Sequence, residues 1–228
     1  MILSIHQPAY LPWLGYFDKL ARSDVFVFLD NVQFEKNSFT NRNRIKTTQG
    51  ALMLTAPVRS KGHTASTLRE TALDNNQRWK ARHLKSMFLN YRSAPRFDAC
   101  YPKLEALYAA EDTLLADMCF RQLQFWLGEL GMEKKLVRAS SLPVASKKSD
   151  LVFDICRHFE ADRYISGALG RGYLDEGKFT NAGIRIEYQD YRHPVYPQLH
   201  GDFLPCMGIV DFWMNTDRFE SIWKGAGQ

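Results

Sequence analysis

The chain lacks most of the features that mark a specialised class of protein. Its four cysteines are widely dispersed and form neither a CxxC pair nor a Cys/His set with the spacing of a zinc site. No apolar run approaches the roughly twenty residues that cross a bilayer. The first residues also lack the cationic segment of a signal peptide. We therefore expect a cytoplasmic protein with free thiols, without a membrane span, a metal or a bound cofactor.

Runs of one charge, internal repeats and low-complexity linkers are missing as well. The 228 residues carry a net charge of +5 and a pI near 9.0, but basic and acidic side chains are mostly interleaved. This pattern argues against nucleic acid as a partner and favours a phosphate-bearing small molecule or carrier. Neither a Gly-x-Ser-x-Gly elbow nor a His-Glu-x-x-His helix occurs. We expect one domain over residues 1–228.

The most informative segment is residues 5–19, at the end of a short apolar run. Residues 1–5 predict a buried strand, so His6 and Gln7 lie where that strand ends. Pro8 and Pro12 stiffen the following turn, and apolar positions at helical spacing predict a helix over residues 12–22. A strand that delivers a histidine to a rigid turn is typical of an active site in α/β proteins. The alternative is that His6 only bonds a backbone group.

A second apolar run, residues 24–30, predicts a strand that ends at Asp30. Strand, helix and strand within thirty residues form a βαβ unit, whose strands are parallel and buried. His6 and Asp30 would then emerge at the same edge of the sheet, where open α/β sheets bind ligands. The predicted fold class is α/β, with a mostly parallel, Rossmann-like central sheet.

The rest of the chain predicts a helical layer followed by a return to α/β alternation. Two strands are expected around a polar turn, at residues 41–46 and 51–58, and then helices at 76–91, 101–110 and 114–130. These helices form an insertion or lid over residues 68–131, in which His83 is expected to be packed. Later elements are a strand ending at 137–138, a helix to 159 with a serine N-cap, a strand at 163–166, a helix at 173–181, a strand at 184–188 and a closing helix at 207–223.

Two further segments offer groups that would bind an anion. Arg42 and Arg44 alternate with Asn41 and Asn43, so on a strand the two guanidinium groups share one face. The alternative is a solvated edge strand. The loop 167–172, after Ser166, holds three glycines and Arg171. A plain glycine-rich turn is an equal alternative there.

Two candidates for chemistry lie near the C-terminus. His193, in the extended segment 191–198, would partner His6 or Asp30 in proton transfer, or would be structural. Cys206 precedes the closing helix and would be a nucleophile if a helix terminus lowered its pKa. Most cysteines are instead small buried hydrophobes.

Together these segments resemble the WbqC-like family across essentially the whole chain. The resemblance is carried by His6-Gln7-Pro8-x-Tyr10-Leu11-Pro12-Trp13-Leu14-Gly15-Tyr16-Phe17-x-Lys19, Asp30-x-Val32-Gln33-Phe34, Asn41-Arg42-Asn43-Arg44-Ile45, Lys148-Ser149-Asp150, Tyr164-Ile165-Ser166-Gly167, Tyr173-Leu174, His193-Pro194-Val195-Tyr196-x-Gln198 and Asp211. One position departs from the family: Gly208 stands where a serine is usual, which puts the substrate or the chemistry in doubt.

The resemblance implies a transferase of surface-polysaccharide or natural-product biosynthesis that places a glycyl or related acyl group on an amine. The expected acceptor is a small-molecule amine or a nucleotide-linked sugar, and the expected donor is an acyl or peptidyl carrier protein or another thioester. His6 would be the general base, with an unperturbed pKa near 6.5. Asp30 would orient it or bind the amine. The other residues expected to bind substrate are Gln7, Tyr10, Trp13, Lys19, Asn41, Arg42, Asn43, Arg44, Ser166, Gly167, Arg171, Tyr173, Tyr196 and Gln198.

Two other functions remain open at this point. The strand, histidine turn and helix look distantly like the opening of nucleotidylyltransferases and class I synthetases, in which a histidine contacts phosphate. The second histidine of that motif is missing here, since Trp13 and Leu14 stand in the region. The chain would otherwise be a non-catalytic protein that binds a carrier or acts as a scaffold.

Overall fold

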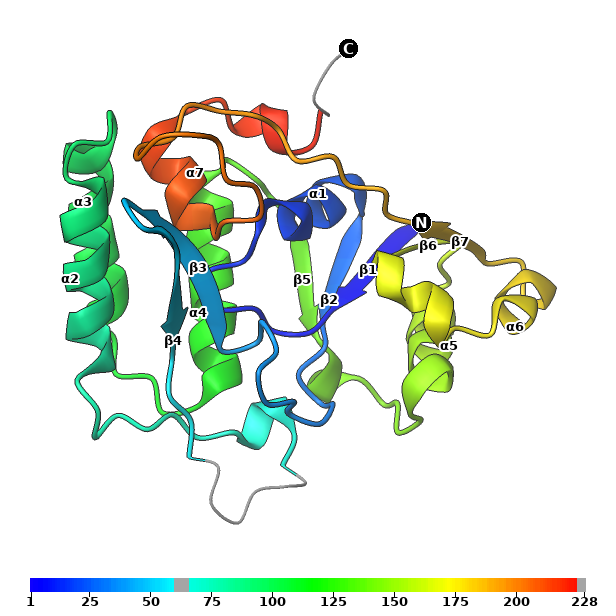
Figure 1. Ribbon diagram of the computed structural model, residues 1–228. Helices are drawn as coiled ribbons and strands as arrows, with labels where there is room; N and C mark the ends of the chain where they lie inside the picture. The colour runs from blue at the N-terminus through cyan, green and yellow to red at the C-terminus, as the bar shows by residue number, and fades with distance from the viewer. Residues whose placement is uncertain (60–65, 225–228) are drawn as a thin grey trace.

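A five-stranded sheet forms the centre of the computed structural model, which describes residues 1–59 and 66–224 (Figure 1). All four strand pairs are parallel, in the order β5-β2-β1-β6-β7. The strands are β1 Ile2–His6, β2 Val25–Phe28, β5 Lys135–Arg138, β6 Arg163–Ser166 and β7 Arg185–Tyr188. The predicted Rossmann-like α/β architecture is confirmed.

Successive side chains of β1 face opposite sides of the sheet, as the pleat requires. Leu3 and Ile5 belong to one core cluster, with the inner face of helix α5, Lys148–His158. Ser4 and His6 face the other side, which helix α1, Leu14–Arg22, covers. Helix α6, Glu176–Asn181, joins the α5 side through Phe179. His6 therefore lies between the sheet and α1.

The order of connections reverses between β1 and β6. From β1 the chain continues to β2 and β5 on one side, and then crosses to β6 and β7 on the other. β1 pairs with β2 as far as His6, opposite Phe28, whereas β1 and β6 pair only as far as Ser4, opposite Ile165. The two central strands thus separate at their carboxyl ends. In open α/β sheets this switch point is the usual ligand crevice.

A β-hairpin and three helices lie at the opposite end of the molecule from α5 and α6 (Figure 1). The hairpin is antiparallel and consists of β3 Arg42–Thr47 and β4 Gly50–Thr55, and the helices are α2 Trp79–Tyr91, α3 Phe97–Ala109 and α4 Leu115–Glu129. α4 packs on the sheet through Phe120, whose ring centroid is 5.1 Å from that of Phe28. The role of these helices as a lid stays a prediction.

Residues 189–206, the C-terminal strap, run from β7 over α1 to helix α7, Ile209–Asn215 (Figure 1). The Gln189 amide fixes the start of the strap by donating to the Gly15 carbonyl at 2.8 Å and to Asp18 Oδ2 at 2.6 Å. The predicted closing helix over residues 207–223 is wrong in length. It ends early because Thr216 is extended and its hydroxyl accepts the Arg218 N–H, which competes with helical bonding.

Other element boundaries also differ from the prediction. The expected serine N-cap of α5 is wrong: Lys147 is the N-cap, and the Ser149 hydroxyl accepts the Asp175 N–H instead. Asp175 caps α6 by accepting the Lys178 N–H, so α6 begins later than residue 173. Short 3₁₀ turns are η1 Leu68–Glu70, η2 Ala139–Ser141, η3 Ala168–Gly172 and η4 Phe219–Ile222. Within residues 1–59 and 66–224, no helix is both long and apolar enough to cross a bilayer.

Candidate functional site

His6 is half-buried at the carboxyl end of β1 and packs against Tyr16 of α1, with 4.6 Å between the ring centroids. Its Nδ1 lies 3.0 Å from the carbonyl oxygen of Gln7. Because a carbonyl only accepts hydrogen bonds, Nδ1 carries the proton in this contact, and Nε2 carries the lone pair. In the described part of the chain Nε2 has no hydrogen-bond partner. It is therefore free to accept a proton from a ligand.

Lys19 projects from α1 toward the same strand end and is only 2% exposed. Its Nζ donates to the Ile5 carbonyl at 3.2 Å, beyond the point where β1 stops pairing with β6. No described acidic side chain forms an ion pair with it. The neighbouring Asp18 is bonded instead to Arg22, at 3.4 Å, and to the strap. A buried amine without a carboxylate partner is costly to keep charged.

Burial shifts both basic groups toward their neutral forms. It lowers the pKa of Lys19 from 10.5 to about 7, against a smaller upward effect of Asp18. The pKa of His6 falls from 6.5 to about 3, mainly through burial and also through the Lys19 charge, while the Gln7 carbonyl acts in the opposite direction. The prediction of an unperturbed His6 near 6.5 is therefore wrong. At neutral pH the imidazole is uncharged, and Lys19 is the group that titrates.

The end of β6 contributes the other side of the switch point. Ser166 donates its hydroxyl to the Gly167 carbonyl at 3.1 Å. A Cβ on Gly170 would lie 2.0 Å from the Ser166 Oγ, so the η3 turn folds back closely onto this serine. Farther out, the Arg171 guanidinium lies over the Tyr188 ring at 4.1 Å and Tyr173 is 51% exposed. Binding of an anion by this turn stays a prediction.

Asp30 is completely buried and has a partner other than His6. Its two oxygens accept the Ser140 N–H at 2.9 Å and the Ser140 hydroxyl at 2.8 Å. Arg138 lies 3.9 Å away. These contacts hold the loop after β2 to the turn after β5. The imidazole of His6 is thus oriented by the Gln7 carbonyl, and Asp30 is placed as a structural group.

The hairpin presents Arg42 and Arg44 on one face and buries Asn41 and Asn43 on the other. Arg42 donates to the backbone and side-chain oxygens of Asn37. The Arg44 guanidinium lies 5.7 Å from the centre of the Phe39 ring. Neither arginine has an acidic partner among the described residues, and both Nε atoms are buried without a bond. This face has charge available for an anionic ligand.

Two aromatic residues of the opening motif take different positions. Tyr10 is fully buried and its hydroxyl bonds His83 Nδ1 at 2.7 Å and the hydroxyl of Tyr108, so Tyr10 lies inside the core and its predicted place in a pocket wall is wrong. His83 is packed as expected, and burial lowers its pKa to about 4. Trp13 covers Gly15 at the start of α1, because a Cβ on Gly15 would lie 2.1 Å from the indole.

His193 lies in the C-terminal strap, away from the contacts of His6. Its ring neighbours are Tyr191, Tyr196 and Phe203, and its Nδ1 is 3.2 Å from the Pro194 carbonyl oxygen. Burial lowers its pKa, and its Nε2 is buried without a partner. The structure therefore gives no contact through which His193 would exchange a proton with His6 or Asp30.

Asp211 anchors the strap to α7 and was not among the predicted site residues. Its buried carboxylate accepts the hydroxyls of Tyr196 at 2.6 Å and Tyr91 at 2.7 Å, and the Gln198 amide at 2.7 Å. Burial raises its pKa, and these hydrogen bonds act against that rise. Tyr196 and Gln198, predicted to bind substrate, are thus engaged in a structural network.

The segment before α7 contains the remaining candidates. Cys206 is exposed, with φ 62°, whereas the other three cysteines are buried. Its role as a nucleophile stays a prediction. Gly208 donates its N–H to the Arg44 carbonyl at 2.8 Å, and a Cβ there would lie 2.8 Å from the Leu11 carbonyl oxygen. A serine at position 208 would require this backbone to move, so the glycine is explained by close packing.

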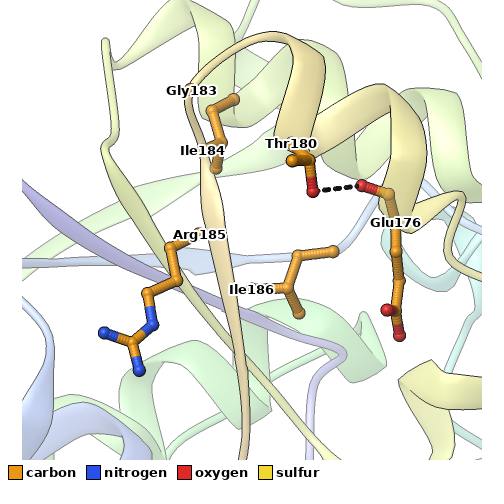
Figure 2. A pocket seen from close by; sticks show the side chains of 6 residues that line it. All are labelled: Glu176, Thr180, Gly183, Ile184, Arg185 and Ile186. Carbon is orange, nitrogen blue, oxygen red and sulfur yellow. Dashed lines mark hydrogen bonds between the residues drawn. The ribbon is translucent and has the colours of Figure 1, made fainter.

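One hollow lies outside this region, on the edge of the sheet (Figure 2). It has a volume of about 380 Å³ and lies between α6 and β7. None of the predicted site residues lines it; the lining residues are Glu176, Thr180, Gly183, Ile184, Arg185 and Ile186. In the described ranges, no cluster of three or more His, Cys, Asp or Glu has the arrangement of a metal site.

Comparison with known proteins adds two findings. The model of the WbqC-like protein family matches residues 7–221. The uncharacterized protein Rv1507c of Mycobacterium tuberculosis is 34% identical over 216 residues, which cover 94% of this chain and 93% of that protein. No solved structure matches the chain.

Proposed function

The chain belongs to the WbqC-like protein family, and from this premise we propose that it is an acyl or aminoacyl transferase. The acceptor would be an amine on a nucleotide-linked sugar or a related metabolite, and the donor a thioester of a carrier protein or of a small thiol. In this reaction the amine nitrogen bonds the carbonyl carbon, the carbon–sulfur bond breaks, and one proton passes from nitrogen to sulfur. The protein must therefore move a proton and bind both substrates.

The observation that carries the proposal is the neutral imidazole of His6 with a free Nε2 at the switch point. Its Nδ1–H is held by the Gln7 carbonyl at 3.0 Å, which fixes the tautomer and the ring orientation. A lone pair in this position accepts an N–H from the attacking amine as the new bond forms. Burial keeps the imidazole uncharged, so it does not repel a cationic acceptor.

Two other sets of groups complete the proposal. Backbone N–H groups of the turn at Ser166 and Gly167 would stabilise the oxyanion that develops on the thioester carbonyl. Arg42 and Arg44, which have no described acidic partner, would hold the phosphates of a nucleotide-linked acceptor. The hairpin would therefore bind substrate and the switch point would carry out the chemistry.

The test is amide formation from a panel of acyl and glycyl thioesters with amino-sugar nucleotides, followed by mass spectrometry. We expect His6→Gln to lower kcat/KM by 10²–10⁴-fold, the usual contribution of a positioned general base. His158→Gln is the matched control, because His158 is exposed on α5 at the far side of the sheet. Wild-type activity in His6→Gln, with His158→Gln equally active, would contradict the proposed base.

Nucleotidyl transfer is the second function that the position of His6 supports, since a histidine at a first strand–helix turn also suits phosphate binding. A thermal-shift panel separates the two functions. ATP or CTP with Mg²⁺, in the absence of any thioester, would raise the unfolding temperature of a nucleotidyl-transferring enzyme. For the acyl transferase we expect the larger shift with amino-sugar nucleotides.

A further inference from the structure

We propose that Lys19 and His6 form a single acid–base unit, in which Lys19 removes the proton that a cationic acceptor must lose and returns it to the leaving thiolate. This inference rests on the proposed transferase and assigns Lys19 a catalytic role. The observation behind it is geometric: a buried amine without an acidic partner bonds the Ile5 carbonyl, past the last β1–β6 pair and one residue before His6, whose Nε2 is free.

The position of Lys19 follows from the splayed strands. β6 pairs with β1 no further than Ser4, so the Ile5 carbonyl, one residue later, is bonded by the Lys19 amine. In its charged form, Lys19 would use one of its N–H donors for this bond to the Ile5 carbonyl. The rest of the amine has no partner among the described residues, although the side chain is only 2% exposed. A ligand in the crevice would meet an amine that has a free lone pair or free N–H groups.

The charges around this amine are already paired with one another. On α1, Asp18 is bonded to Arg22 and to the Gln189 amide. On β7, Glu187 pairs with Arg22 and with Arg163. The β1 group that faces Lys19 is His6, and a proton on either basic group disfavours a proton on the other. The pair therefore holds at most one proton near neutral pH, and that proton resides on Lys19.

When the acceptor arrives as an ammonium ion, aminolysis of a thioester requires a group that first takes one proton and later gives it back. Neutral Lys19 takes H⁺ from the acceptor ammonium, which frees the nitrogen lone pair for attack on the carbonyl carbon. Protonated Lys19 gives its proton to the sulfur as the carbon–sulfur bond of the tetrahedral adduct breaks, and Lys19 is neutral again. The second nitrogen proton then passes to His6 Nε2, which releases it to water. The products are an amide, a thiol and one H⁺, which balances the ammonium consumed.

The first test does not depend on finding the substrate. The ¹³Cε resonance of Lys19 in the intact wild-type protein, assigned by its loss in Lys19→Gln, is followed between pH 5 and 11. We expect Lys19 to titrate with a pKa of about 7. A titration of Lys19 above pH 9.5 would overturn the inference.

The second test distinguishes proton transfer from a simple need for positive charge. Lys19→Arg keeps the charge but cannot release its proton, and Lys19→Gln lacks the charge. We expect both to lower kcat/KM by 10²–10⁴-fold and to lose the rise of activity near pH 7, with Lys85→Gln unchanged. Lys19→Arg with activity within tenfold of wild type would show that only the charge matters, and would overturn the proton-transfer role.

The two proposals fail in different ways. If every thioester is inert with wild-type protein while Lys19 titrates near pH 7, the transferase and the proton transfer to its thiolate are wrong, and only the low pKa of Lys19 is established. If wild-type protein is active but Lys19 titrates in the ordinary range, the transferase stands and the unit is wrong. Thermal unfolding of each variant shows whether a loss of activity comes from misfolding.

Discussion

Replacement of Lys19 by methionine should make the stability of the protein less dependent on pH. Methionine fills nearly the same volume without the amine. In the wild type the pKa of Lys19 is lowered from 10.5 to about 7, so the folded state binds fewer protons than the unfolded state between these values. Stability therefore rises with pH from about 7 to 10.5 and is lowest below that window.

The magnitude follows from 1.36 kcal/mol per pH unit. The lowered pKa of Lys19 costs the wild-type fold about 4 kcal/mol at pH 7 and about 2 kcal/mol at pH 9, from the linkage relation. Lys19→Met avoids this cost but leaves the Ile5 carbonyl without its donor, which costs about 1–3 kcal/mol at every pH. We therefore expect the stability of the variant relative to wild type to fall by about 2 kcal/mol between pH 7 and pH 9.

Urea unfolding at several pH values in this range measures the difference directly, and other titrating groups cancel because both proteins contain them. Lys85→Met, on the exposed face of α2, is the control and should follow the wild type at each pH. A stability difference between Lys19→Met and wild type that stays constant from pH 7 to pH 9 would refute the reasoning. It would mean that Lys19 is solvated or paired with an anion.

Three other substitutions test the surroundings of the site. Gly208→Ser should destabilise by about 1–3 kcal/mol in thermal unfolding, because its Cβ meets the Leu11 carbonyl at 2.8 Å, whereas Gly172→Ser, in open space, should cost less. Asp30→Ala should lower the urea midpoint through loss of its two bonds to the turn after β5, yet keep kcat within tenfold; a 10³-fold loss would restore its catalytic assignment. His6→Gln should flatten the loss of stability in acid between pH 6.5 and 3, where burial of the neutral imidazole makes the wild-type fold weaken as pH falls.

The sequence predicted those parts of the fold that depend on local patterns. Apolar runs located β1 and β2, and the histidine at the end of β1 lies at the edge where the strand order reverses. The alternation of Arg42 and Arg44 with two asparagines predicted their shared face, because a strand has a period of two. Such signals require only a few neighbouring residues.

The partners that the sequence did not indicate are contacts between distant segments. Asp30 lies at a strand end as expected, but its partner, Ser140, is 110 residues away and has no local signature. His193 follows a proline-rich pattern like that of the first motif, yet it belongs to the strap that α7 anchors. Neither carboxylate partners nor the path of a strap can be inferred from spacing along one chain.

The sequence contained a signal that the side chain of Lys19 is buried against the sheet. It lies three residues after Tyr16, and residues at this spacing share a helix face. Tyr16 packs on Phe26 of the sheet, so the next turn of the same face also meets the sheet. A lysine in that register is buried or reaches the sheet edge. Lys19 was expected to bind substrate from the family resemblance and not from this spacing, because lysine usually faces solvent.

The arrangement at the first strand–helix turn favours an amine over a phosphate as the reacting group. Phosphate at such a turn is usually held by the N-terminal N–H groups of the helix. Here the Trp13 indole covers the start of α1 over Gly15, and Tyr191 packs edge-to-face on that indole at 5.3 Å. His6 is neutral, so it brings no positive charge to a phosphate.

A nucleotide would instead place its phosphates at the hairpin arginines. The double variant Arg42→Ala/Arg44→Ala should therefore raise KM for a nucleotide-linked acceptor at least tenfold while leaving kcat nearly unchanged. An equal effect on an acceptor without phosphate would contradict this division between binding and chemistry.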